Sequence, residues 1–497
     1  MTSAVEHLDV LIIGAGLSGI GAAHHLQRAF PARTYAILEA RAAIGGTWDL
    51  FRYPGIRSDS DMFTLGYRFR PWLGDKAIAD GPSILDYVRE TAAEAGIDRH
   101  IRFGHRARRA EWSSDEQRWT VTARRADTGD TVTLTANFLF CCSGYYRYDQ
   151  GYTPDFVGRD RFEGTIVHPQ HWPRELAVEG KRIVIIGSGA TAVTLGPALT
   201  ALGAHVTMVQ RSPSYVLSVP ARDAVADRLR RMLPSRAAYT LARAKNIAYS
   251  TAIYQLCQRR PERMRAWIRG LQQHWLPEGY DIDTHFAPRY NPWDQRMCLV
   301  PNGDLFRAIR KGALEMVTDD IDAFTATGLR LSSGAELPAD IIVTATGLDL
   351  LIFGGIELAV DGAPVDVPKA MAYRAMMLSG VPNFAYIIGY TNASWTLKAD
   401  LVCEYIVRLL RHMDARGYAA VTPVRDESVG TTAFLPNFSA GYVLRAADRF
   451  PAAGDRTPWR LHMNYLRDLP AFRYRRIADR ALRFTSVARR AAAHSAS

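Results

Sequence analysis

Two segments of the chain carry the same succession of apolar and polar positions. Leu8–Ile13 is a short apolar, β-branched run, a glycine-rich turn follows it, and Ile20–Phe30 has apolar residues at helical spacing. Thr34–Leu38 is a second apolar run, so this segment predicts one βαβ unit. The same pattern begins again at Lys181 and ends with the apolar run Ala204–Val209. Two βαβ units therefore organise the sequence.

The residues around these units predict the arrangement of the domains. A helix is expected over Ser83–Ala95, hairpin-like strands over Arg108–Ala136, and buried closing strands over Phe138–Cys142 and Ile341–Gly347. We expect an α/β fold with two Rossmann-like dinucleotide-binding domains. The first would span residues 1–147 and return over 336–497 with a C-terminal segment, and the second would span 148–335 with a helical insertion at about 221–280.

The turn of the first unit has the glycine spacing of a dinucleotide site. In Gly14-x-Gly16-x-x-Gly19, the first glycine makes the turn, the second admits a pyrophosphate and the third packs the helix against the strand. The phosphates would lie at the positive N-terminus of that helix. Glu39 ends the second strand, where it can accept hydrogen bonds from an adenosine ribose.

The second unit differs at the end of its second strand. Its turn runs Gly187-Ser188-Gly189-Ala190-Thr191-Ala192, but no acid follows, and the strand ends in Val209-Gln210-Arg211-Ser212. A carboxylate there would repel a 2′-phosphate, whereas Arg211 and Ser212 can bind one. We therefore expect this site to prefer NADPH to NADH. The alternative is that Arg211 is an ordinary surface residue at a strand end.

Together the two sites predict a protein that transfers electrons. The acid-ended site fits FAD and the arginine-ended site fits NADPH, and the electrons could then pass to a disulfide or to oxygen. A disulfide reductase needs a spaced cysteine pair beside the flavin, whereas Cys141 and Cys142 are adjacent in a predicted buried strand. The five cysteines include no CxxC pair, so no metal site is predicted either. Oxygen is the favoured acceptor.

The charge of the chain is concentrated in one segment. Hydrophobic residues are 48% and charged residues 22%, which is typical of a folded protein, and the net charge is +11. Residues 221–270 hold twelve Lys or Arg against three acids, interleaved with apolar residues as in amphipathic helices. This pattern favours a solvated basic face, leaves peripheral membrane contact open, and disfavours a nucleic-acid partner.

The sequence also predicts where the protein acts. It has no apolar run long enough for a transmembrane helix, and Met1–Val10 contains Glu6 and Asp9 rather than a basic and then apolar signal pattern. A cytoplasmic location is expected, with peripheral membrane association left open. The oligomeric state is not readable from the sequence.

Two further motifs resemble those of the type I Baeyer–Villiger monooxygenases. Phe162-x-Gly164-x-x-x-His168-x-x-x-Trp172-Pro173 is similar to the FxGxxxHxxxW(P/D) fingerprint of that family. The stretch that begins at Gly45 (GGTWDLFRYPGIRSD, ending at Asp59) is similar to its second pattern. The resemblance extends from about residue 5 to 470. We expect His168 and Trp172 to pack a linker between the domains rather than to perform chemistry.

The resemblance implies a reaction and its catalytic residues. The family reduces FAD with NADPH and forms a C4a-peroxyflavin with O2, which converts ketones to esters or lactones and oxygenates sulfides or thioamides. Arg296 lies where the family has its catalytic arginine, and Asp59 matches the carboxylate that orients it. From the residues alone, Arg296 could instead form a surface ion pair with Asp294.

The resemblance also implies the residues that contact the cofactors. Many members of the family have a lysine for the 2′-phosphate where this chain has Gln295, which leaves more of the NADPH preference to Arg211. The contacts implied for FAD are Ser18, Thr47, Trp48, Asp49, Leu50 and Ala107, and those for NADP are Arg57, Ser58, Asp59, Gly187, Ser188, Gly189, Ala190, Thr191, Ala192 and Val193.

Two other functions remain possible at this point. A flavin-containing monooxygenase restricted to sulfur or nitrogen would share both nucleotide sites, and an assay with a ketone separates it from the first interpretation. A regulatory protein that binds NADPH without turnover would leave Asp59 and Arg296 without a role.

Overall fold

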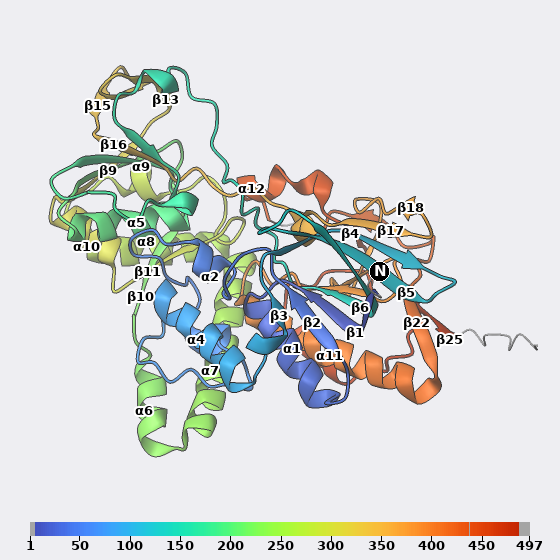
Figure 1. The fold of residues 1–497 in the computed structure, drawn as a ribbon. Coiled ribbons are helices and arrows are strands. Elements are labelled where there is room, and N and C mark those ends of the chain that lie inside the picture. The colour runs from blue at the N-terminus through green and yellow to red at the C-terminus, as the bar shows by residue number, and fades with distance from the viewer. Residues whose placement is uncertain (1–4, 437, 487–497) are drawn as a thin grey trace, which may run out of the picture.

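The computed structural model describes residues 5–436 and 438–486, which fold into two lobes around two sheets (Figure 1). In the first sheet, β1 (Glu6–Ile13) lies between β2 (Tyr35–Leu38) and β6 (Thr131–Cys141) and runs parallel to both. The sheet has nine strands in the order β18-β17-β4-β5-β6-β1-β2-β3, and β21 also pairs with β6. The other members are β3 (Ile101–Arg102), β4 (His105–Ser113), β5 (Arg118–Arg125), β17 (Glu357–Val360), β18 (Ala363–Pro364) and β21 (Phe384–Tyr386).

The central strands of this sheet are apolar on both faces, so both faces are covered. Helices cover one of them. The apolar sides of α1 (Leu17–Ala29), α4 (Gly81–Glu94) and α11 (Trp395–Arg416) share one buried cluster with the sheet. The opposite face packs against a second cluster that includes the hairpin tryptophans Trp112 and Trp119. Strands β17, β18 and β21 come from the last third of the chain, so the chain returns to the first lobe as expected.

The second sheet is wholly parallel, in the order β12-β9-β8-β16-β7. Its strand β16 (Ile341–Thr344) pairs with β7 and β8. The sequence predicts that the second domain ends at residue 335. Because β16 follows that residue and still belongs to the second sheet, the predicted boundary is too early. An apolar run closed by a glycine fits either sheet, so the pattern alone could not assign the strand. The remaining elements are β7 (Thr165–Val167), β8 (Arg182–Ile186), β9 (His205–Gln210), β12 (Leu314–Thr318), α5 (Ala190–Ala201) and α10 (Asp304–Arg310).

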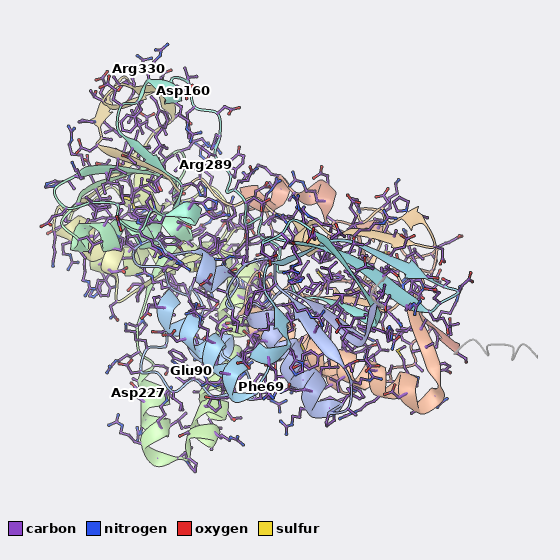
Figure 2. The ribbon with its side chains drawn as sticks, in the orientation of Figure 1. Phe69, Glu90, Asp160, Asp227, Arg289 and Arg330 are labelled. Atoms are coloured by element: carbon purple, nitrogen blue, oxygen red, sulfur yellow. The ribbon has the colours of Figure 1, made fainter. Side chains whose placement is uncertain are left out.

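Three helices form the insertion, of which α6 and the adjoining part of α7 project beyond both lobes (Figure 1). They are α6 (Ala224–Met232), α7 (Ser235–Arg259) and α8 (Pro261–Trp275). The Asp223 carboxylate accepts hydrogen bonds from the first backbone N–H groups of α6, which fixes where that helix begins. Asp227, on the first turn of α6, lies on this projecting part (Figure 2).

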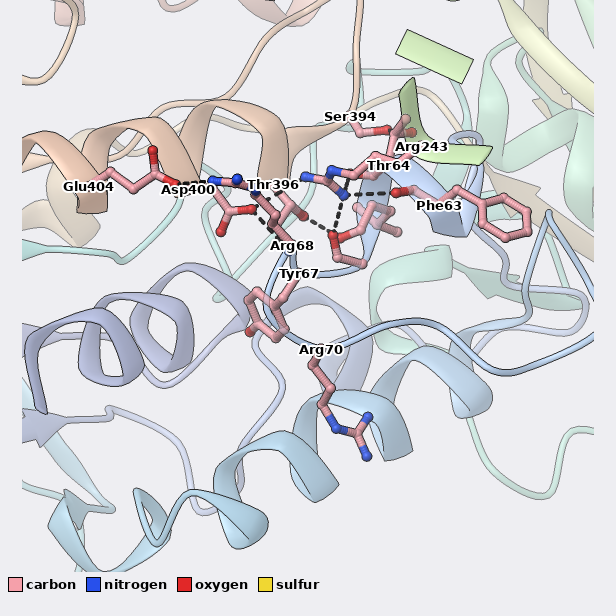
Figure 3. Close-up of polar contacts among 12 residues, drawn as sticks. Phe63, Thr64, Tyr67, Arg68, Arg70, Arg243, Ser394, Thr396, Asp400 and Glu404 are labelled. Atoms are coloured by element: carbon pink, nitrogen blue, oxygen red, sulfur yellow. Dashed lines mark hydrogen bonds and ion pairs between the residues drawn. The ribbon is translucent and has the colours of Figure 1, made fainter. Parts of the chain in front are cut away.

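Although the insertion belongs to the chain of the second lobe, its first part is docked on the first. The guanidinium of Arg243 in α7 donates to the carbonyl oxygens of Phe63 at 2.8 Å and Gly66 at 2.7 Å, and it pairs with Asp400 of α11 at 3.3 Å (Figure 3). The N–H of Ala77 donates to the carbonyl of Ala221 at 2.8 Å. The α8 helix instead contacts β10 (Val216–Val219) of the second lobe, through a bond from its Gln272 amide to the Val216 carbonyl.

Small elements complete the described chain. No helix within residues 5–436 and 438–486 is both long enough and apolar enough to span a bilayer. The small elements are α2 (Thr47–Leu50), α3 (Met62–Leu65), α9 (Ile282–Phe286), α12 (Gly441–Leu444), α13 (Tyr465–Arg473), β10 (Val216–Val219), β11 (Cys298–Pro301), β13 (Ile321–Thr325), β14 (Gly328–Leu331), β15 (Glu336–Pro338), β19 (Ala372–Tyr373), β20 (Met377–Leu378), β22 (Tyr418–Pro423), β23 (Thr431–Thr432), β24 (Ala453–Gly454) and β25 (Leu482–Ser486).

Candidate active site

A large cleft of about 1180 Å³ lies between the two sheets. Residues of both glycine-rich turns border it, together with the ends of β2 and β9. Because parallel strands end at the same edge of a sheet, each lobe contributes its carboxyl-terminal edge to the cleft. This is the place where dinucleotides bind in open α/β sheets.

The first turn has the close packing that its glycines predict. Gly14 has a φ of +98°, and a Cβ there would lie 2.9 Å from the carbonyl oxygen of Cys142. A Cβ on Gly19 would lie 1.8 Å from the carbonyl oxygen of Gly14, so only glycine lets the helix pack on the strand. The Glu39 carboxylate accepts hydrogen bonds from the N–H groups of Ala15 and Arg41, while burial raises its pKa. Glu39 thus braces the turn and also borders the cleft.

The second turn also packs closely against the backbone, but against a different segment of the chain. Gly187 has a φ of +136°, and a Cβ there would lie 2.4 Å from the carbonyl oxygen of Ala345. Around Gly189 a Cβ would meet no atom within 4 Å, so this position opens to the cleft. Arg211 is exposed at the end of β9, and within the described residues its guanidinium has no ion pair or hydrogen bond. Its charge is available to a ligand in the cleft.

The cleft also contains an arginine and a carboxylate that lie far apart in the sequence. Nε and Nη2 of Arg296 each donate to one oxygen of Asp59 at 2.7 Å, and Nη1 donates to the carbonyl of Thr391 at 2.8 Å. These bonds use three of the five N–H groups of the guanidinium. Burial opposes the charge of Arg296, but Asp59 more than offsets this, so the pKa of Arg296 lies above its ordinary value. The arrangement is a fixed cation with one edge left for a ligand.

This geometry decides between the two interpretations of Arg296. Asp294 accepts a bond from the N–H of Asn291, and its own carbonyl accepts one from Ser439, whereas Arg296 pairs with Asp59. The surface ion pair that the residues alone allowed is therefore wrong.

Aromatic side chains that the sequence reasoning missed surround this pair. Tyr145, Tyr146 and Tyr442 border the cleft, and the field of Arg296 acts on all three phenols. Trp395 also borders it, and its indole N–H donates to Ser18 at 2.7 Å. The tyrosines after Gly144 follow directly on a closing strand, which could have pointed to them. Nothing around Tyr442 in the sequence marks it out.

Most of the predicted contact residues border the cleft, and four do not. Gly19 packs against the first turn, while Ala192 and Val193 face the core of the second lobe. His168 and Trp172 also lie outside the lining, as their expected linker role requires. Those in the lining are Gly14, Gly16, Ser18, Glu39, Thr47, Trp48, Leu50, Arg57, Ser58, Asp59, Ala107, Gly187, Ser188, Gly189, Ala190, Thr191, Arg211, Ser212 and Arg296.

Asp49 is the fourth of these residues, and its side chain has a structural role instead. It is 2% exposed and forms ion pairs with Arg41 at 2.6 Å, Arg52 at 3.1 Å and Arg89 at 3.2 Å. These pairs hold α2 against α4 and against the turn after β2. The sequence motif around Asp49 gave no indication that its carboxylate points away from the cleft.

The chain is similar to known monooxygenases over almost its whole length. A sequence profile of the pyridine nucleotide-disulphide oxidoreductases matches residues 8–236. The FAD-containing monooxygenase EthA of Mycobacterium tuberculosis is 59% identical over 480 residues, which are 96% of this chain and 98% of EthA. The chain belongs to the EthA family of FAD-containing monooxygenases.

Membership of the EthA family confirms three of the predictions. The protein is a flavoprotein monooxygenase, so oxygen rather than a disulfide is the acceptor, and it is an enzyme rather than a nucleotide-binding regulator. FAD is its cofactor. The buried Cys141 and Cys142 agree with this assignment, since Cys142 borders the cleft but Cys141 does not, and adjacent cysteines are not the spaced pair of a disulfide reductase.

Two solved structures have the same fold as this EthA-family chain. Cyclohexanone monooxygenase with bound ε-caprolactone has a TM-score of 0.74 at 20% identity and covers 97% of this chain and 100% of its own. Oxidised steroid monooxygenase bound to NADP has a TM-score of 0.71 at 24% identity and covers 84% and 88%. The expected fold of two Rossmann-like domains is thereby confirmed.

Proposed function

We propose that the protein is an NADPH-dependent Baeyer–Villiger monooxygenase that converts ketones to esters or lactones and oxygenates sulfides or thioamides. The single observation that carries the proposal is the Arg296–Asp59 pair, which lies in the cleft between the two glycine-rich turns. Cyclohexanone monooxygenase and steroid monooxygenase, which have the same fold, support it through their bound ε-caprolactone and NADP.

In this proposal each lobe holds one nucleotide. The first turn and Glu39 would hold FAD, because Gly14 and Gly19 leave the backbone open to a pyrophosphate and Glu39 faces the cleft. The second turn and Arg211 would hold NADPH in the lobe that ends at β16. When bound, the two cofactors supply the hydride and activate the oxygen that is transferred to the substrate.

The residues of the chain contribute charge, orientation and exclusion of water. Arg296 would stabilise the negative charge that develops on oxygen during the transfer, because its guanidinium is already fixed by Asp59 and Thr391. Asp59 acts through Arg296 as a positioning residue. Tyr145 and Tyr146 are partly buried and would help to keep water away from that charge.

Arg211 would determine the preference for NADPH. We expect Arg211→Gln to raise the KM for NADPH about tenfold or more, because a charge-assisted hydrogen bond to the 2′-phosphate is lost, and to leave the KM for NADH unchanged. Steady-state oxidation of both nucleotides measures this, with the exposed Arg330→Gln as a charge-matched control. Equal changes for NADPH and NADH would contradict the role.

The reaction is tested with the purified flavoprotein. NADPH oxidation is measured with phenylacetone or with methyl phenyl sulfide, and the products are identified by mass spectrometry. An ester from phenylacetone supports the proposal. A sulfoxide without any ester would show an enzyme restricted to sulfur or nitrogen, and hydrogen peroxide as the sole product with both compounds would contradict the proposed substrate classes.

The insertion supports contact with an anionic membrane surface as part of this proposal. Val225 and Met232 on α6 and Leu241 and Tyr249 on α7 are large exposed apolar side chains. They lie in the segment with twelve Lys or Arg against three acids. We expect the enzyme to sediment with anionic vesicles but not with neutral ones, and Met232→Asp with Leu241→Asp to abolish this. Equal binding of the variant would contradict the contact.

A further inference from the structure

A second cavity, of about 450 Å³, lies behind the wall of the cleft. It is bordered by α11, α13 and residues 457–463, and this size is typical of a small-molecule site. Tyr390 borders both cavities, and its hydroxyl donates to Asp468 at 2.7 Å. No residue that we assign to the reaction reaches this cavity.

The floor of the second cavity combines apolar side chains with paired charges. Ile388, Phe434 and Phe472 are buried there, and Leu461 and Met463 are partly exposed beside them. The two cations of the floor are already paired, since Lys398 lies 2.8 Å from Asp468 and Arg374 lies 3.2 Å from Asp479. The floor can therefore cover a hydrocarbon chain without leaving a buried charge unpaired.

The rim, in contrast, carries cations without partners. Arg460, Arg467 and Arg475 border the cavity and are exposed, and within residues 5–436 and 438–486 none of their guanidinium groups has an ion pair or a hydrogen bond. Many other arginines of the described chain are paired, as with Arg70 and Glu94 at 2.7 Å. The rim offers three free bidentate donors at the mouth of an apolar cavity.

The balance of charge around the cavity is positive. Asp468 is the one carboxylate among its described lining residues, and it already accepts hydrogen bonds from Lys398 and Tyr390. The pKa of His462 is lowered, first by burial and then by the charges of Arg460 and Arg467, with Asp468 opposing them. An anion that enters the cavity meets no free carboxylate there.

We propose that this cavity is a second ligand site for an apolar carboxylate. The carboxylate would bind Arg460 and Arg467, and the hydrocarbon chain would lie over Phe434 and Met463. Arginine binds carboxylates through two parallel hydrogen bonds, while each buried methylene adds to the affinity. The site is independent of the oxygenation reaction and of the identity of its substrate.

Equilibrium dialysis of radiolabelled decanoate against the flavoprotein, with NADP⁺ present, tests the site. We expect Arg460→Gln with Arg467→Gln to weaken binding about tenfold or more. The exposed Arg416→Gln with Arg480→Gln removes the same charge elsewhere and should leave binding unchanged. These four residues are exposed, so flavin absorbance and NADPH oxidation should be unaltered in both double variants. An equal loss in the two variants, or no binding to the wild type, would overturn the proposal.

The length of the hydrocarbon chain provides the second test. Each buried methylene adds to the affinity, so decanoate should bind at least about tenfold more tightly than hexanoate. Decanol lacks the anion and should bind at least about tenfold more weakly than decanoate. Binding of hexanoate and decanoate with equal affinity would show a plain anion site and would overturn the apolar part of the proposal.

Discussion

Of the arginine–aspartate pairs that join distant parts of this chain, Arg243–Asp400 and Arg296–Asp59 differ in what surrounds them. The side chains of Arg243 and Asp400 are 7% and 5% exposed, whereas those of Arg296 and Asp59 are 28% and 29% exposed. In the enclosed pair, Nη1 of Arg243 donates only to oxygens of the protein, among them the Phe63 carbonyl. In the cleft pair, two N–H groups of the Arg296 guanidinium form no bond within the described residues, and Arg296 borders the cleft.

The difference shows how one interaction serves two purposes. When protein oxygens surround a guanidinium, its removal strands a buried carboxylate, and the effect falls on stability. When part of the guanidinium faces a cleft, water can solvate the carboxylate left behind, and the effect falls on the reaction. The three predictions below separate these effects.

Arg243→Met should have the largest effect on stability. Removing one partner of a buried ion pair costs about 3–5 kcal/mol, and Asp400, which is 4% exposed, would keep the N–H of Arg68 at 3.2 Å and the ring of His25 at 3.6 Å but no arginine. The free energy of unfolding is measured by urea denaturation of the flavoprotein. Arg236→Met removes an exposed arginine from the same helix and should have little effect. A similar small change for both variants would show that the enclosed pair is not needed for stability.

Arg296→Met should act on the reaction. We expect the rate of substrate oxygenation to fall about 10²- to 10³-fold, as on loss of one preorganised electrostatic group, with a smaller loss of stability than in Arg243→Met. Product formation is measured by mass spectrometry and flavin content by absorbance. The exposed Arg289, which Figure 2 labels, gives the control Arg289→Met. Retained product formation would contradict the assignment of Arg296.

His24, beside the enclosed pair, should have the smallest effect, seen as a dependence on pH. Its ring stacks on Phe69 at 3.6 Å, and burial, followed by the charge of His25, lowers its pKa to about 4. Between pH 6.5 and 4 the unfolded state therefore binds a proton that the folded state does not, so stability falls as pH falls. The free energy of unfolding, measured with urea across this pH range, should depend less steeply on pH in His24→Gln than in the wild type. The difference should correspond to up to about one bound proton. The slope should not change in His205→Gln, which alters an exposed histidine.

The local parts of the fold could be predicted from the sequence, and the long-range parts could not. The glycine turns and the strands beside them follow from spacing within about 30 residues, because a βαβ unit is a local structure. The place of β16 was assigned to the wrong lobe, since an apolar run does not show which sheet it joins.

The same limit applies to the candidate site. Glu39 and Arg211 follow from their positions at strand ends, whereas the pairing of Arg296 with Asp59, 237 residues away, could be inferred only from the family resemblance. Asp49 shows the opposite error. It lies inside a matching motif and was predicted to contact FAD, but its side chain forms ion pairs with three arginines.

The docking of the insertion determines how this enzyme could be recombined with its relatives. Residues from Ala221 to Ile247 of α7 are held by groups of the first lobe, such as Asp400, while the end of α7 and α8 pack against the second. A chimaera that exchanges the second lobe should therefore keep residues 221–247 from the parent of the first lobe. Junctions placed at the ends of the sequence-defined domain would separate Arg243 from its carbonyl partners.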